Sequence, residues 1–250
     1  MSIAAPAIGM LRERHLHASL KRWYALPGDQ VELAVDGYVV DLVRGELLIE
    51  IQTRGFAGMP PKVLALLASG HRLRVVHPIA VDRWIVQVDD DGQFLGRRRS
   101  PRHGDLVDLA AELVTFRELL DDPGFEIEVL LTREEEVRRH DPKRCWRRHG
   151  WTVVERRLID VLDRVTLARP GDLTRWLPET LSEPFTTAEL AVALHRPRRT
   201  AQQLTYCLRR PGVIEAIGTH DRSAAYRLVP RDGDRRAATE TPREARGVVG

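Results

Sequence analysis

The chain of 250 residues lacks the features of several protein classes. Its two cysteines, Cys145 and Cys207, lie far apart and form no CxxC pair, so neither a zinc knuckle nor a disulfide framework is indicated. No apolar run approaches the length of a membrane span, and the N-terminus has no basic-then-apolar signal pattern. These absences predict a cytoplasmic protein with no membrane partner.

The composition is that of an ordinary globular protein, with 43% hydrophobic and 30% charged residues. The formal net charge is only +3, but arginine dominates the cations and clusters along the chain, at 97–99, 138–139, 144–148 and 196–199. Clustered arginine suits phosphate, because its planar guanidinium group can bond two oxygens at once. The alternative is an arginine-rich surface that is simply solvated.

The most informative segment is a pair of apolar runs, 39–43 and 47–52, that meet at a tight turn over 44–46. Runs with apolar residues at consecutive positions are typical of strands buried on both faces. Three polar residues interrupt them: Asp41, Glu50 and Gln52. A carboxylate buried there without a partner costs several kcal/mol or shifts its pKa.

The expected geometry of this hairpin brings the polar residues together. With a two-residue loop at 44–45, Asp41 pairs opposite Leu48, and the alternation of side chains puts Glu50 and Gln52 on the same face. Two acids and an amide converging inside a sheet predict a divalent-metal site. The alternative is that buried arginine or lysine partners satisfy both acids, which then serve only the fold.

The order of elements predicts an α/β fold with a mixed sheet flanked by helices. Proline at 60 and 61 is expected to open a helix, and the Asp36-Gly37 pair is a hairpin turn signal. The expected elements are a helix over 11–24, strands over 30–35, 38–43 and 47–53, a helix over 60–68, and strands over 73–79 and 83–88.

These residues resemble the PD-(D/E)XK, or restriction-endonuclease-like, nuclease fold, whose signature is an Asp on the second strand and Glu-x-Lys on the third. The match is Asp41 followed by Glu50-Ile51-Gln52, with Gln52 where lysine is usual. Lys62, at the start of the next helix, is the alternative source of the missing cation. The resemblance covers roughly residues 10–90.

The resemblance implies a metal-dependent DNA endonuclease that hydrolyses phosphodiester bonds with Mg²⁺ or Mn²⁺. Asp41, Glu50 and the carbonyl of Ile51 would bind the metal. Gln52 or Lys62 would orient water or steady the phosphate, and Glu13 matches the acid that many members carry on the first helix.

The middle of the chain is expected to be largely helical. A helical pattern covers 106–120, and 125–131 reads as a short strand or the start of a helix. Thr132 as an N-cap with Glu135 three residues later makes a capping box, which predicts a charged helix over 134–139. The Arg- and Trp-rich stretch 143–151 is a candidate linker or nucleic-acid strap, and a tryptophan anchored in a domain interface is the alternative.

The C-terminal third resembles a winged helix-turn-helix domain over roughly 152–230. It is expected to contain an amphipathic helix over 153–165, a helix capped by Thr186, a helix over 200–210, and a hairpin of 213–217 with 225–229. Such domains bind DNA or protein with similar frequency. The expected DNA contacts lie on the third helix and in the wing: Arg198, Arg199, Gln202, Gln203, Arg209 and Arg222.

The sequence therefore predicts an α/β nuclease-like core and a mainly α C-terminal domain. The expected divisions are 10–95 for the core, 96–150 for a helical extension and linker, 151–230 for the winged helix, and 231–250 for a disordered tail. The leading hypothesis is a DNA endonuclease. The alternatives are an inactive nuclease-fold DNA-binding protein or transcription regulator, and an adaptor that contacts protein. A homodimer is left open.

Overall fold

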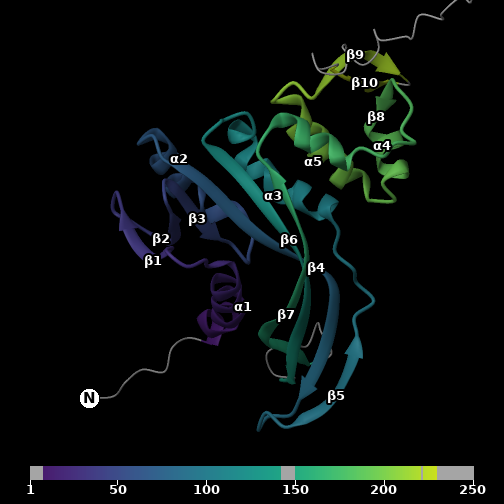
Figure 1. Ribbon diagram of the computed structural model, residues 1–250. Coiled ribbons are helices and arrows are strands. Elements are labelled where there is room, and N and C mark those ends of the chain that lie inside the picture. The colour runs from purple at the N-terminus through teal and green to yellow at the C-terminus, as the bar shows by residue number, and fades with distance from the viewer. Residues whose placement is uncertain (1–7, 142–149, 221, 230–250) are drawn as a thin grey trace, which may run out of the picture.

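A computed structural model describes residues 8–141, 150–220 and 222–229, with side chains from residue 15 onward (Figure 1). The expected disordered tail and most of the Arg- and Trp-rich stretch lie outside these ranges. The N-terminal elements are α1 (Ile8–Tyr24), β1 (Gln30–Val35), β2 (Tyr38–Arg44), β3 (Leu47–Ile51), η1 (Phe56–Gly58), α2 (Pro60–Ala68), β4 (Arg72–Val88) and β5 (Phe94–Arg99). The later ones are η2 (Leu106–Leu109), α3 (Ala110–Leu113), η3 (Val114–Leu119), β6 (Phe125–His140), β7 (Trp151–Leu167), η5 (Pro170–Trp176), β8 (Phe185–Thr186), α4 (Thr187–Ala193), α5 (Arg198–Arg209), β9 (Ile214–His220) and β10 (Ser223–Leu228).

A mixed sheet organises most of the described chain. Its order is β1-β2-β3-β4-β6-β7, and β5 pairs with the far half of β4. Strand β4 runs parallel to both β3 and β6, whereas the β1-β2, β2-β3, β4-β5 and β6-β7 pairs are antiparallel. The expected mixed sheet flanked by helices is confirmed.

Helices α1 and α2 cover opposite faces of this sheet. Successive residues of β4 point to opposite faces, and Val75 packs in the core cluster that contains α2 and α3, whereas Val76 packs with α1. Leu16 and Leu20 of α1 are buried in this second cluster. Asp41 and Glu50 therefore lie in a sheet with a helix on each side.

The β2–β3 hairpin forms with a register that differs from the expected one. Arg44 pairs with Leu47, so the two-residue loop is Gly45–Glu46 and Val43, rather than Asp41, lies opposite Leu48. Gly45 supplies the positive φ of 58° that this tight turn requires. The register slips by two residues from the expected one. The prediction that Asp41 and Glu50 share a face is not met, because Asp41 contacts His17 and Lys21 of α1, whereas Glu50 contacts Lys62 of α2 on the other face of the sheet.

Two segments that the sequence predicts as helices are strands. Residues 134–139 belong to β6, and 153–165 belong to β7, which pairs with β6 along nearly its whole length. The capping box at Thr132 does not form; Thr132 Oγ1 instead donates to Glu134 Oε1 (2.9 Å). The sheet thus continues to Leu167, through residues that the sequence assigned to an extension and to the start of a winged helix.

Other elements agree with the sequence more closely. Pro60 and Pro61 occupy the first turn of α2, and Thr186 caps α4 in a capping box with Glu189. The expected strands over 73–79 and 83–88 are one continuous strand, β4. The helical pattern over 106–120 forms as short turns, η2, α3 and η3.

The C-terminal segment forms a small unit at one end of the main sheet. Helices α4 and α5 are joined by a short turn and pack beside a three-stranded sheet of order β8-β10-β9. Helix α5 contacts α3, and β5 lies at the opposite end of the molecule (Figure 1). Cys207 is buried in α5, where burial raises the pKa of its thiol to about 12.

Candidate functional site

Asp41 lies on β2 and is held by three donors. The Ile51 N–H donates to Asp41 Oδ2 (2.9 Å), and His17 Nε2 lies 3.1 Å from the same oxygen. Lys21 Nζ lies 3.6 Å from Asp41 Oδ1. Burial would raise the pKa of this carboxyl, but the contacts with His17 and Ile51 outweigh it and hold the pKa below 3.8. Asp41 is therefore ionised at neutral pH.

Glu50 lies on β3 and is paired with a lysine from the other face of the sheet. Lys62 Nζ, in the first turn of α2, donates to Glu50 Oε1 and to the carbonyl of Val39 (2.5 Å). The Glu50 side chain is only 12% exposed. Burial raises the pKa of Glu50 above 4.5, and the negative charge of Asp41 raises it further. The contact with Lys62 lowers the pKa but does not outweigh these two effects.

The two carboxylates occupy the point where the β2–β3 ladder ends. The last paired residues are Leu42 and Ile49, and the next residue of each strand is Asp41 or Glu50. Asp41 turns to α1, whereas Glu50 takes its cation from α2. The structure thus brings the predicted acids near enough to influence each other's ionisation, with separate cation partners.

Gln52 makes other contacts than the predicted ones with water or phosphate. Its side-chain Nε2 donates to the Gly55 carbonyl (2.8 Å), and its backbone carbonyl accepts from His77 Nδ1 (2.7 Å). Lys62, rather than Gln52, is the group on Glu50. Glu13 lies on α1, one turn before His17, and its side chain is outside the described atoms.

The oxygen ligands available at this point are of the chemical type that a hard cation prefers. Asp41 and Glu50 offer carboxylate oxygens and Ile51 a backbone carbonyl, the ligand types that Mg²⁺ takes together with several waters. Within the described residues, no group of three or more His, Cys, Asp or Glu side chains is placed to hold a metal. A metal here would rest on two carboxylates and would compete with Lys62 and Lys21 for them.

The site residues predicted from the sequence include neither His17 nor Lys21, both of which contact Asp41. His17 and Lys21 are four residues apart on α1, so both project from one face of the helix. This spacing was the available signal. The hydrogen bond to Asp41 raises the pKa of His17 above 6.5.

The residues expected to contact DNA lie together on α5 and the β9–β10 turn. Arg198, Arg199, Gln202, Arg209 and Arg222 are exposed, and Gln203 is half-buried. Arg198 and Arg199 form no ion pair with another described residue. By contrast, Arg210 is paired with Glu118 and Asp121, which fastens the end of α5 to the η3 region.

Comparison with known proteins finds a relative of similar length. An uncharacterized protein of Treponema pallidum (strain Nichols) is 27% identical over 234 residues, which cover 92% of this chain and 90% of the relative. No solved structure matches the chain significantly. No helix of the described residues is long and apolar enough to cross a membrane.

A family profile matches residues 14–168, more than half of the chain. This span begins in α1 and ends just after β7, so it contains the whole main sheet together with Asp41, Glu50 and Lys62. The chain therefore belongs to the family described as Domain of unknown function (DUF8091).

Proposed function

We propose that this protein is a metal-dependent phosphodiesterase that cuts DNA. The observation that carries the proposal is the position of Asp41 and Glu50 at the point where the β2–β3 ladder ends, with Lys62 of α2 paired to Glu50. Two carboxylates and a lysine are the groups that phosphodiester hydrolysis uses to hold a metal and to steady a phosphate.

Each residue has a role in this proposal. Asp41 and Glu50, with the Ile51 carbonyl, hold Mg²⁺ or Mn²⁺, which when bound polarises the phosphate and lowers the pKa of a water. Lys62, which pairs with Glu50 here, would contact a phosphate oxygen. Gln52 is fixed on Gly55, which favours Lys62 for the contact with phosphate.

The C-terminal unit supplies the DNA contact in this proposal. The order β8-α4-α5-β9-β10, with β10 between the other two strands, supports a winged-helix arrangement that lacks the first helix expected over 153–165. In it α5 is the recognition helix, and its exposed Arg198 and Arg199 suit contacts with phosphate.

The test is cleavage of duplex and single-stranded DNA with Mg²⁺ or Mn²⁺. Asp41→Asn and Glu50→Gln should abolish cleavage and leave DNA binding at low salt intact, because phosphate contacts on α5 remain. Glu46→Gln removes an exposed acid from the turn of the same hairpin and should cut like the wild type. Cleavage that persists in both site variants would contradict the proposal.

A second candidate is a DNA-binding protein that does not cut. It is favoured by the cation partners that both carboxylates already have, and by glutamine in place of the usual lysine. In that case wild-type protein binds DNA through α5 at low salt, without cleavage in either metal. Arg198→Gln with Arg199→Gln should then weaken binding and reduce its salt dependence.

A further inference from the structure

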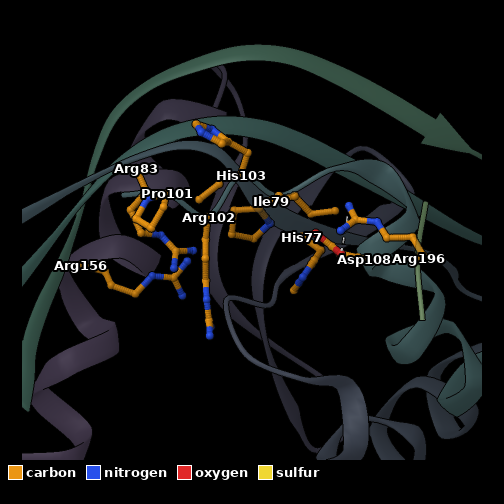
Figure 2. A pocket seen from close by; sticks show the side chains of 12 residues that line it. His77, Ile79, Arg83, Pro101, Arg102, His103, Asp108, Arg156 and Arg196 are labelled. Carbon is orange, nitrogen blue, oxygen red and sulfur yellow. Dashed lines mark ion pairs between the residues drawn. The ribbon is translucent and has the colours of Figure 1, made fainter. Parts of the chain in front are cut away.

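A pocket of ≈ 580 Å³ lies beyond the end of β3, beside the residues discussed above but not formed by them. Four arginines and two histidines line it, with one acid among them (Figure 2). Its charged and imidazole residues are His77, Arg83, Arg102, His103, Asp108, Arg156 and Arg196. A concave site with this excess of cations is suited to an anion.

The sheet topology explains why a pocket forms here. Strand β4 pairs with β3 only as far as Val76, and with β5 only from Trp84 onward. In the described part of the chain, no strand therefore neighbours residues 77–83 of β4 on that side. The segment 100–104 covers this edge instead, and it carries Arg102 and His103 to the mouth of the pocket.

The covering segment is fixed to β4 by hydrogen bonds. The Ser100 N–H donates to the Arg83 carbonyl (2.8 Å), the Gly104 N–H to the Ala80 carbonyl (3.0 Å), and His103 Nδ1 lies 3.0 Å from the Val81 carbonyl. A Cβ on Gly104 would lie 2.7 Å from Ile79 Cγ2 and 2.9 Å from the Ala80 carbonyl oxygen. Only glycine permits this close approach. Together with the hydrogen bonds to β4, it makes the wall of the pocket preorganised for a ligand.

Several of the pocket cations are only partly compensated. Arg102 is exposed and forms no ion pair with any other described residue. Arg83 reaches Glu136 only at 3.5 Å, and Glu136 is shared with Arg138, which lies at 2.5 Å. The buried Nε of Arg83 has no hydrogen-bond partner among the described residues.

The other two arginines are anchored by carboxylates. Arg156 Nε and Nη2 donate to Glu134 Oε2 (3.0 and 2.7 Å), and Arg196 pairs with Asp105 and Asp108. Arg83, Arg102 and Arg156 lie on one side of the pocket, and Arg196 with Asp108 on the other, with His77 between (Figure 2). Fixed guanidinium groups keep their remaining N–H donors available to a ligand.

We propose that this pocket binds a phosphate monoester dianion, with the guanidinium groups of Arg102 and Arg83 as its principal donors. Guanidinium forks match the spacing of phosphate oxygens, and charge-assisted hydrogen bonds of this type are about twice as strong as neutral ones. The dianion would offset the incompletely paired charge of Arg83 and the charge of Arg102. The site uses neither Asp41 nor Glu50, so it stands or fails independently of DNA cleavage.

The test is binding by isothermal titration calorimetry with the full chain and no metal, using inorganic phosphate as the first ligand. Arg102→Glu should weaken binding at least about tenfold, because a charge-assisted contact is replaced by repulsion. The matched control is Arg98→Glu, an exposed arginine on β5 outside the pocket, which should bind like the wild type. Equal weakening by both variants, or no phosphate binding by the wild type, would overturn the proposal.

Two further ligands identify the source of the phosphate. If a 5′-nucleoside monophosphate binds more tightly than inorganic phosphate, and Arg102→Glu loses this binding, the pocket's ligand is a free nucleotide. The strand end is tested with two oligonucleotides that differ only in a 5′-phosphate or a 5′-hydroxyl. If the control variant Arg98→Glu prefers the 5′-phosphorylated oligonucleotide and Arg102→Glu binds both equally, the pocket's ligand is the phosphorylated end of a strand. Equal binding of both oligonucleotides by the wild type, together with no effect of Arg102→Glu on inorganic phosphate, would refute a monoester pocket.

Discussion

Replacing Lys62 with methionine isolates the charge of Glu50. Methionine keeps most of the apolar length of the side chain but removes the ammonium group that Glu50 Oε1 accepts from. Breaking a buried ion pair by removing one partner costs about 3–5 kcal/mol. Lys62 is 21% exposed and Glu50 12%, so solvent reduces this cost, and we expect a loss of about 2–3 kcal/mol at neutral pH.

The loss should depend on pH and on the second partner. For a chain of this size it corresponds to a fall in Tm of about 4–12 °C, measured by thermal unfolding. The loss should shrink as the pH falls toward the raised pKa of Glu50, because the protonated carboxyl no longer needs a cation. The double variant Glu50→Gln with Lys62→Met should regain most of the stability, since no buried charge remains.

Added Mg²⁺ or Mn²⁺ separates a metal site from a purely structural ion pair. A metal that binds Glu50 should stabilise Lys62→Met, by about 2.7 kcal/mol at a concentration 100 times its Kd, and should stabilise the double variant much less. Equal metal stabilisation of the two variants would refute Glu50 as a ligand. A Lys62→Met protein as stable as the wild type at neutral pH would refute the account of the pair.

Three other substitutions test separate parts of the structure. Because the pKa of His17 is raised in the folded state, its protonation stabilises the fold fully below pH 6.5, and this stabilisation is lost as the pH rises through the folded pKa. His17→Asn should therefore reduce the pH dependence of the unfolding free energy in this range. Tyr24→Phe should cost about 1–3 kcal/mol in chemical denaturation, because Tyr24 Oη donates to the buried Glu128 (2.6 Å). Gly104→Ala should cost about 1–3 kcal/mol and weaken phosphate binding, because its Cβ would displace the wall of the pocket; wild-type phosphate affinity in this variant would contradict the role given to that segment.

The hairpin and its acids could be predicted because their signals are local. A glycine at the turn and apolar runs on both sides define β2 and β3, and two isolated carboxylates mark Asp41 and Glu50 within them. The exact register could not be predicted, because loops at 44–45 and 45–46 both suit the sequence. The helix start at Pro60 and the cap at Thr186 were equally local and are confirmed.

The second half of β6 and the strand β7 were missed, because tertiary contacts override a helical pattern. Glu134 of β6 pairs with Arg156 of the neighbouring β7, and Glu136 pairs with Arg138 of its own strand and, at 3.5 Å, with Arg83 of β4. A charged segment that looks solvated is thus buried by cross-strand pairing. The available signal was the enrichment of β7 in β-branched residues over 152–166.

The arginine pocket could not be predicted, since its walls come from segments far apart in the chain. His77 and Arg83 lie on β4, Arg102 on the covering segment, Arg156 on β7 and Arg196 before α5. They come together because residues 77–83 of β4 pair with the segment 100–104, rather than with a strand, on one side. The sequence shows the arginine clusters but not which of them share a cavity.

The most direct test of the central claim is Mn²⁺-dependent cleavage of DNA by the wild type and by Glu50→Gln under identical conditions. The account predicts cleavage by the wild type and its loss in Glu50→Gln, with DNA binding unchanged. Cleavage at the same rate by both proteins, or tight DNA binding by the wild type without any cleavage in either metal, would contradict it.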